Sequence, residues 1–534
     1  MTDALIQLVA NAPILSIIIF LPVAGAIIIA LMSPAKSHRI KWLAFWVSAA
    51  TFLISLFLLA GGGGFEKFSH IEQYPWLPQI GVSYHIGVDG ISLWLVLLTT
   101  FLLPISILSS FSAITKREKE YYILLLLMGF ALTGTFVALD LFLFFLFWES
   151  VLIPMYLLIG IWGSRRRVYA ATKFVLYTVV GSFFMLLAII GLYVYSGNFG
   201  SGSFDFLYLR GHIAPPELQP WLFLAFFLAF AIKVPLFPFH TWLADAHTEA
   251  PTAGSVLLAA VLLKMGGYGF IRFCLTLFPE ASVWAAPWIM GLAVISIIYG
   301  ALVCAAQTDF KRLIALSSVA HMGFVMLGIF SFANTTVGQV GATIQMVNHG
   351  VTTGALFLLV GVIYERRHTR EIAQFGGLAS VMPQYYNVFL ITMLASVGLP
   401  ALNGFVGEFL ILLGAFRADW ALGGLATFGV VLAAVYLFTM FRRVFHGECT
   451  KPENQKLLDL NARELVYLVP LVLLMLWIGL YPKPYLGVIK PAVDRSVRAV
   501  MRITSGSVEY ARSGEKAGAI LAQVQPADTP GGDS

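Results

Sequence analysis

Long apolar runs recur along this sequence from its beginning to about residue 481. Each run holds roughly 20 residues, the length that an α-helix needs to cross a ~30 Å hydrocarbon core. Only 11% of the residues are charged and 59% are hydrophobic, whereas an ordinary soluble domain is about 25% charged. The sequence therefore predicts an all-α integral membrane protein rather than two or three soluble domains.

The apolar runs divide into about fourteen predicted transmembrane spans. They cover residues 3–32, 40–60, 91–113, 119–138, 139–162, 169–195, 219–248, 253–273, 284–306, 310–331, 338–363, 383–415, 422–445 and 464–481. Because helices pack side by side in lipid, we expect residues 1–484 to form a single polytopic domain. Residues 485–534 are polar and are predicted to form a partly mobile C-terminal tail.

The basic residues between the spans favour one orientation in the membrane. One set of loops, which includes Lys311, holds nineteen of them, and the alternate set holds Lys67, Arg210, Arg272 and Arg417. By the positive-inside rule the richer set faces the cytoplasm, so both termini are expected on the outer side. The basic tail breaks this rule with Lys483, Lys490, Arg495, Arg498, Arg502, Arg512 and Lys516.

The composition argues against several classes of partner and cofactor. The basic residues are not gathered into one patch, so nucleic acid is not an expected partner. Cys274, Cys304 and Cys449 lie far apart and form no C-x-x-C pair, so no iron–sulfur, zinc or disulfide site is expected. The sequence also contains no GxGxxG motif and no P-loop.

Four charged residues lie deep inside predicted spans: Glu149, Lys233, Lys264 and Glu408. A charge at mid-bilayer costs at least ~3 kcal/mol, so four cost ~12 kcal/mol, comparable to the stability of a whole domain. Such a cost indicates pairing or function, and ion pairs that tie helices together are the structural alternative. Lys173 is a weaker candidate, because it closely follows three cytoplasmic arginines and can snorkel to the interface.

Four histidines also fall in predicted spans: His240, His247, His321 and His349. Histidine titrates near neutral pH, so it can both accept and release a proton. Histidines that share their spans with buried lysines suit a proton relay. Hydrogen-bonded packing residues are one alternative reading, and axial ligation of a haem by two of these histidines is another.

Two spans carry helix breakers beside these ionisable residues. The breakers are Pro235 and Pro238, which follow Lys233, and Gly398, Pro400 and Gly404, which precede Glu408. Broken helices next to charged residues mark the ion site of many transporters, whereas passive kinks are the structural alternative. Because the breaks fall in the seventh and twelfth spans, we predict two five-helix repeats, 119–273 and 284–445, with the second inverted in the membrane.

Seven segments together resemble one known family, the subunit M family of bacterial respiratory complex I, whose mitochondrial counterpart is NADH dehydrogenase subunit 4. The resemblance extends over nearly the whole chain to about Tyr481. The segments are GVDGIS (Gly87 to Ser92), WES around Glu149, KVPLFPFHTWLADAHTEAP (Lys233 to Pro251), LLKMGGYG around Lys264, DFKRLIALSSVAHMG (Asp309 to Gly323), VNHG at His349 and GLPALNGFVGEF (Gly398 to Phe409).

The resemblance implies an antiporter-like subunit with one proton channel in the membrane arm of a proton-translocating NADH:quinone oxidoreductase. Glu149 and Lys233 would form a modulating pair, Lys264 would be the central relay lysine, and Glu408 would be the terminal residue towards the outside. The histidines that would lie on or near the hydrophilic axis are His321, His349 and, beside the seventh-span break, His240. His247 and Lys173 are weaker candidates.

The resemblance also implies a setting for the chain, namely the bacterial cytoplasmic (inner) membrane, with the sister subunits L and N as partners. NADH, FMN, iron–sulfur clusters and quinone would bind to other subunits, with no cofactor or metal in this chain. A sodium/proton antiporter subunit on the same scaffold is one alternative, although such antiporters resemble subunits L and N in having lysine at the place of Glu408. A passive structural spacer is the other alternative.

Overall fold

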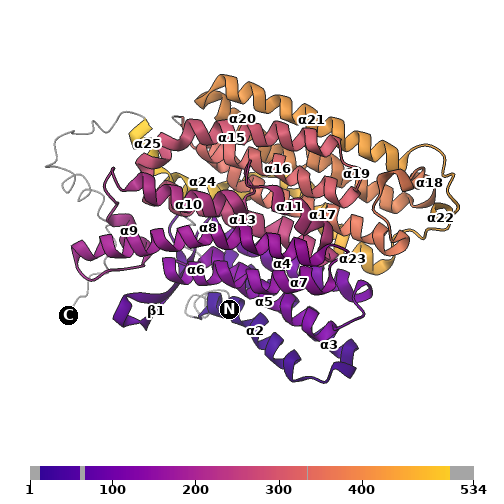
Figure 1. Ribbon diagram of the computed structural model, residues 1–534, viewed down its shortest axis with the longest axis horizontal. Coiled ribbons are helices and arrows are strands. Elements are labelled where there is room, and N and C mark those ends of the chain that lie inside the picture. Colours follow the sequence, from indigo (N-terminus) through magenta and orange to yellow (C-terminus); the bar gives the residue numbers. More distant parts are fainter. Residues whose placement is uncertain (1–11, 61–65, 334, 505–534) are drawn as a thin grey trace.

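The computed structural model describes residues 12–60, 66–333 and 335–504. Within these ranges twelve helices are long and apolar enough to cross a membrane, and they lie side by side in one elongated bundle (Figure 1). The chain is therefore the helical, multi-pass membrane protein that its apolar runs predict. The twelve are α2 (Ile14–Leu31), α3 (Ser37–Ser55, with its flanking turns), α4 (Ser92–Ala113), α5 (Glu118–Val137), α6 (Leu141–Ser150) continued by α7 (Leu152–Trp162), α8 (Arg167–Ser196), the run from α12 (Thr252–Leu257) to α14 (Leu275–Leu277), α15 (Pro279–Ala305), α16 (Phe310–Phe330), α17 (Val337–Arg367), α21 (Trp420–Phe445) and α23 (Ala462–Leu480).

The two remaining predicted spans, 219–248 and 383–415, are each interrupted. They correspond to the helix pairs α10 (Gln219–Lys233) with α11 (Thr241–Glu249) and α19 (Pro383–Val397) with α20 (Asn403–Ala418).

Prolines explain the gap between α10 and α11. Pro235 and Pro238 have no backbone N–H and cannot continue a helix. Side chains satisfy part of the freed backbone, as irregular segments at membrane depth require. The indole of Trp242 donates to the carbonyl of Ile232 at 2.9 Å, and the backbone N–H of Phe237 donates to a serine hydroxyl of α15 at 2.9 Å.

Left-handed backbone explains the gap between α19 and α20. Gly398 and Ala401 have φ values of +84° and +74°. Gly404 lets α20 begin close to α19, because a Cβ at this position would lie 2.0 Å from the carbonyl oxygen of Ala395. The gap therefore holds the first turn of α20, and Glu408 one turn later, against the end of α19.

The span from α12 to α14 is wholly buried and irregular. Two π-helical segments, η5 (Leu258–Leu262) and η6 (Phe270–Cys274), flank α13 (Leu263–Gly269). Such π segments are frequently found at functional sites. Lys264 comes two residues after the end of η5, so the widened turn lies close to a buried charge.

One end of the bundle, which we call the hairpin end, carries structure that the apolar pattern does not predict. Strands β1 (Ser69–Leu77) and β2 (Val82–Val88) form an antiparallel hairpin there, near the short helix α9 (Phe206–Gly211) (Figure 1). Part of the predicted polar tail is also helical, as α24 (Lys483–Ser496) and α25 (Arg498–Thr504). Residues 505–534 of that tail lie outside the described residues.

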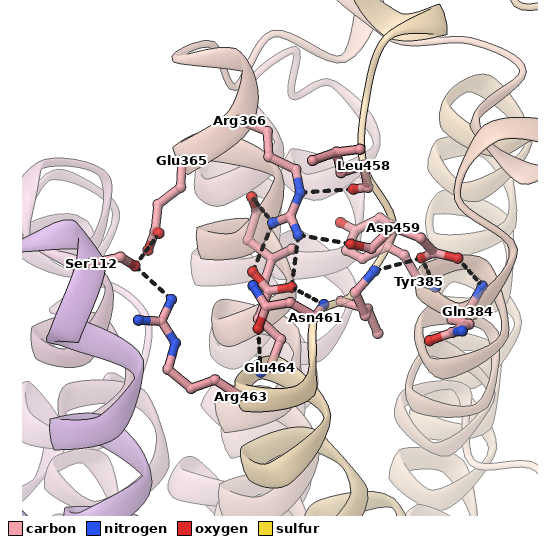
Figure 2. A network of polar contacts seen from close by, with 12 residues as sticks. Ser112, Glu365, Arg366, Gln384, Tyr385, Leu458, Asp459, Asn461, Arg463 and Glu464 are labelled. Atoms are coloured by element: carbon pink, nitrogen blue, oxygen red, sulfur yellow. Dashed lines mark hydrogen bonds and ion pairs between the residues drawn. The ribbon is translucent and has the colours of Figure 1, made fainter.

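A polar network joins four helices at the opposite end (Figure 2). Arg366 at the end of α17 binds both carboxylate oxygens of Glu464, at 2.8 and 2.7 Å, in the first turn of α23. Asp459 accepts from the backbone at the start of α19, and Ser112 at the end of α4 links Arg463 to Glu365. The network fixes the last span, α23, against the centre of the bundle.

Candidate functional site

A chain of buried polar side chains crosses the centre of the bundle, starting at Lys264. The Lys264 ammonium lies 2.6 Å from Nδ1 of His349 on α17 and donates to the carbonyl of Ala259 in η5 at 2.6 Å. An ammonium has only donors, so a charged Lys264 requires Nδ1 of His349 to be the accepting nitrogen. The hydrogen of His349 then sits on Nε2, which has no hydrogen-bond partner within the described ranges.

The chain continues through His321 to Glu408. The rings of His349 and His321 have centroids 5.6 Å apart. Nδ1 of His321, on α16, lies 3.2 Å from a carboxylate oxygen of Glu408 on α20, and the same oxygen accepts from Gln345 at 3.2 Å. None of the residues Lys264, His349, His321 and Glu408 is more than 5% exposed. Side chains from four predicted spans, 253–273, 310–331, 338–363 and 383–415, thus lie in one row across the bundle.

A small cavity of about 10 Å³ borders the two histidines and Ser396. The Ser396 hydroxyl lies 3.4 Å from Nε2 of His321. A cavity of this size holds at most one water, whereas cofactor sites occupy about 300–1,000 Å³. The space between these histidines therefore suits a bridging water and does not suit the haem considered above.

Glu149 and Lys233 lie on neighbouring helices without a direct ion pair. Lys233, the last residue of α10, is fully buried, and its ammonium lies 4.9 Å from the ring of Trp148 and 5.8 Å from that of Phe174. Its nitrogen and one carboxylate oxygen of Glu149 have no hydrogen-bond partner among the described residues. Glu149 directly follows Trp148, whose ring the Lys233 ammonium faces, so the two charged residues lie in the same region of the bundle. The pair is close enough to interact and is open in this structure.

The remaining predicted site residues lie along α11 and α8. His240 packs between the rings of Phe237 and Tyr299, with centroids 5.8 and 5.2 Å away. His247 is completely buried against an aromatic ring of α17, and neither ring nitrogen has a hydrogen-bond partner among the described residues. Lys173 is paired with Asp245 at 2.7 Å and is partly exposed, so it ties α8 to α11 and lies apart from the buried chain.

The sequence reading missed three polar residues of this region. Gln345 and Ser396 contact the chain directly, as described above. Gln345 lies one helical turn before His349, and this i, i+4 spacing on an apolar span is the signal that could have found it. Lys311, counted as a loop cation, is only 6% exposed and donates to the carbonyl of Ala250 at the end of α11.

Within the described ranges no group of three His, Cys, Asp or Glu residues is arranged to hold a metal ion. The three cysteines are free and separate.

Residues 138–434 match the family described as NADH:quinone oxidoreductase/Mrp antiporter, TM, and residues 16–135 match NADH-ubiquinone oxidoreductase chain 4, amino terminus. The subunit M of NADH-quinone oxidoreductase from Rhodobacter capsulatus is 47% identical over 498 residues, covering 91% of this chain and 96% of its own length. The chain belongs to the subunit M (chain 4) family of NADH:quinone oxidoreductases.

Solved structures place this subunit M family member among antiporter-like membrane subunits. A chain of respiratory complex I from Thermus thermophilus with bound NADH aligns with a TM-score of 0.83 at 36% identity, over 91% of this chain and 99% of that chain. A chain of the Mrp complex from Dietzia sp. DQ12-45-1b shares the fold, with a TM-score of 0.77 at 22% identity, over 91% of this chain and 52% of that chain. The protein is thus an antiporter-like membrane subunit of respiratory complex I.

Proposed function

We propose that this subunit conducts protons across the membrane through a relay of Lys264, His349, His321 and Glu408. NADH oxidation and quinone reduction in other subunits drive the transfer. The observation that carries the proposal is the row of buried groups from the Lys264 ammonium to the Glu408 carboxylate, with close polar contacts at both ends and the two histidine rings 5.6 Å apart between them. Each of these groups can both hold and release a proton, and the intervening cavity has room for at most one bridging water.

The open Glu149–Lys233 pair is proposed to modulate the relay. Burial favours a neutral lysine, while a nearby carboxylate favours the ammonium. Movement of Glu149 towards Lys233 would therefore retain a proton on Lys233, and movement away would release it towards Lys264. Driving one charge against 100 mV needs ~2.3 kcal/mol, which is within the reach of forming or breaking one buried pair.

The subunit is also proposed to have the topology, membrane and neighbouring subunits that its sequence implies. Residues 119–273 and 284–445 would form two inverted five-helix repeats within a domain of about fourteen spans, and both termini would face outward from the bacterial inner membrane. Subunits L and N would be neighbours in the membrane arm, and the cofactors would reside elsewhere in the complex.

The direct test replaces Lys264 with Met in the assembled complex. Lys264→Met should leave NADH oxidation measurable but lower the number of protons pumped per electron in proteoliposomes, because it removes the central proton carrier. Lys173→Met is the matched control and should pump normally, since Lys173 pairs with Asp245 and lies apart from the four relay residues. An unchanged proton-to-electron ratio in Lys264→Met would reject the relay.

A further inference from the structure

Arg272 occupies the hairpin end of the same buried span that carries Lys264. Lys264, Tyr268 and Arg272 follow one another at intervals of four residues, so they lie along one face of the helix, with Arg272 about 12 Å from Lys264 along the axis. Arg272 lies in η6 and is only 2% exposed. The positive-inside count assigned it to a loop, so its burial is a finding of the structure.

The groups around Arg272 form a closed hydrogen-bond arrangement. Its guanidinium donates to Asp89 at 2.5 Å and to the Tyr268 hydroxyl at 3.2 Å. Tyr268 in turn donates to the backbone carbonyl of Phe136 at 2.9 Å. The same Asp89 oxygen also accepts from the backbone N–H groups of Ile91 and Ser92, both at 3.1 Å. Asp89 is thereby held against the start of α4.

This arrangement cannot pass a proton along. A relay needs groups that accept one proton and donate another, whereas an arginine has only donors and does not lose its proton in proteins. The hydroxyl of Tyr268 is committed to a carbonyl, which has no proton to hand on. A fixed arginine in a narrow path excludes protons and other cations. Proton transfer from Lys264 towards the hairpin end therefore stops at Tyr268 and Arg272.

The C-terminal helices α24 and α25 carry further arginines to the hairpin end. α24 crosses the hairpin end so closely that a Cβ on Gly90 would lie 2.0 Å from the carbonyl oxygen of Val488. The ring of Tyr485 also packs against Trp94 at 4.5 Å. α24 thus brings basic residues of the tail to this end of the bundle.

Arg210 on α9 lies close to several other basic side chains at the hairpin end. Burial, followed by the neighbouring cations Arg495, Arg272 and Arg498, lowers the pKa of Arg210 to about 10, with only Asp89 acting in the opposite direction. Arg498 has Glu66 as a partner at 3.8 Å, with both side chains about half exposed, so this outermost ion pair is only weakly held. Several basic side chains therefore lie near Arg272, with Asp89 and Glu66 as acidic partners.

We propose that Tyr268, Arg272 and Asp89, backed by the tail arginines, form an outer seal that blocks direct proton passage between Lys264 and the hairpin end. The seal forces protons to leave through Glu408 and prevents their return along the first repeat. This inference rests on the proposed relay. An ion pair that merely ties helices together would not need to lie in line with Lys264, and apolar packing would serve that purpose as well.

The experiment measures passive proton leak in proteoliposomes that contain the assembled complex without NADH, under an imposed potassium diffusion potential. Arg272→Gln should raise the leak at least about tenfold, the change produced by lowering a barrier by ~1.4 kcal/mol. NADH oxidation should continue with fewer protons pumped per electron. Arg272→Lys should also leak, because a buried lysine can release its proton whereas an arginine cannot. Arg417→Gln, which removes an exposed arginine from α20, should leak no more than the wild type.

A double variant identifies the path of the leak. In Arg272→Gln/Lys264→Met the leak should return to the wild-type level, because the opened route begins at Lys264. A leak that persists in the double variant, or an assembled Arg272→Gln complex that does not leak, would overturn the seal and leave the relay intact. Normal pumping in Lys264→Met alone would instead reject the relay.

If Arg272→Gln fails to assemble, the surface variant Arg495→Gln/Arg498→Gln tests the same inference. This variant leaves the buried ion pair in place and removes two of the cations beside Arg210. It should increase proton entry after an acid pulse applied to the hairpin end. Entry equal to that of the wild type would overturn the proposed contribution of the C-terminal helices.

Discussion

Glu408 ends the buried chain, where it contacts His321 and accepts from Gln345. Either a carboxylate or an amine at this position can bind and release a proton, whereas a methyl group cannot. We therefore expect Glu408→Lys to retain more pumping than Glu408→Ala, measured as protons per electron in proteoliposomes. Equal losses in the two variants would show that position 408 takes no part in proton transfer.

Glu149 and Lys233 should depend on one another although they do not touch. The Lys233 ammonium is buried without a hydrogen-bond partner among the described residues, and Glu149 is half-buried with one carboxylate oxygen unpartnered, so removing one charge leaves the other uncompensated. A double-mutant cycle with Glu149→Gln and Lys233→Met, scored by thermal stability of the complex, should give a coupling of about 0.5–3 kcal/mol. Pumping should fail in the double variant. Strictly additive losses would mean that the pair does not act as a switch.

Among single residues, the sequence predicted the charged members of the site but not their neutral polar partners. A lysine or glutamate in an apolar run stands out because of its cost in lipid. Gln345 and Ser396 do not stand out, since neutral polar residues are inexpensive in a helix. Their roles follow from contacts with residues more than 60 positions away in the chain. Such contacts depend on the tertiary fold, which composition does not specify.

At the scale of single elements, the gap before α20 positions Glu408. Gly404→Ala would place a Cβ 2.0 Å from the carbonyl oxygen of Ala395, so α20 must move away from α19. We expect a lower melting temperature and weaker pumping. Gly424→Ala on α21 is the matched control, because its Cβ would meet no atom within 4 Å, and alanine stabilises a helix by about 1 kcal/mol relative to glycine. A Gly404→Ala complex as stable and active as Gly424→Ala would contradict this account.

The elements also differ in how far sequence could predict them. Pro235 and Pro238 remove backbone donors, so the interruption after α10 could be placed from residue types alone. The π segments η5 and η6 contain no residue type that marks them in the sequence. Their wider turns depend instead on how neighbouring helices pack around them. The hairpin of β1 and β2 was also missed. Nearly all the residues of β1 are at least partly exposed, so it lacks the alternation of buried and exposed residues that marks a strand.

For the whole molecule, the proposed orientation predicts opposite labelling of the two ends. Gly211→Cys at the end of α9 should react with a membrane-impermeant maleimide in intact cells, and Arg443→Cys near the end of α21 should react only after permeabilisation. Both sites are exposed, while two of the three native cysteines are buried and the third, Cys449, lies on the predicted cytoplasmic side. The reverse pattern would invert the topology and exchange the proposed entrance and exit.

The close passage of α24 over Gly90 also bears on the order in which the protein is made. The first spans leave the ribosome and enter the membrane long before residues 483–504 exist, so the early bundle has Trp94 uncovered. The packing around the start of α4 is completed only when α24 arrives. A truncation before α24 should therefore yield an inserted bundle whose hairpin end is incomplete, however well the earlier spans have entered the membrane.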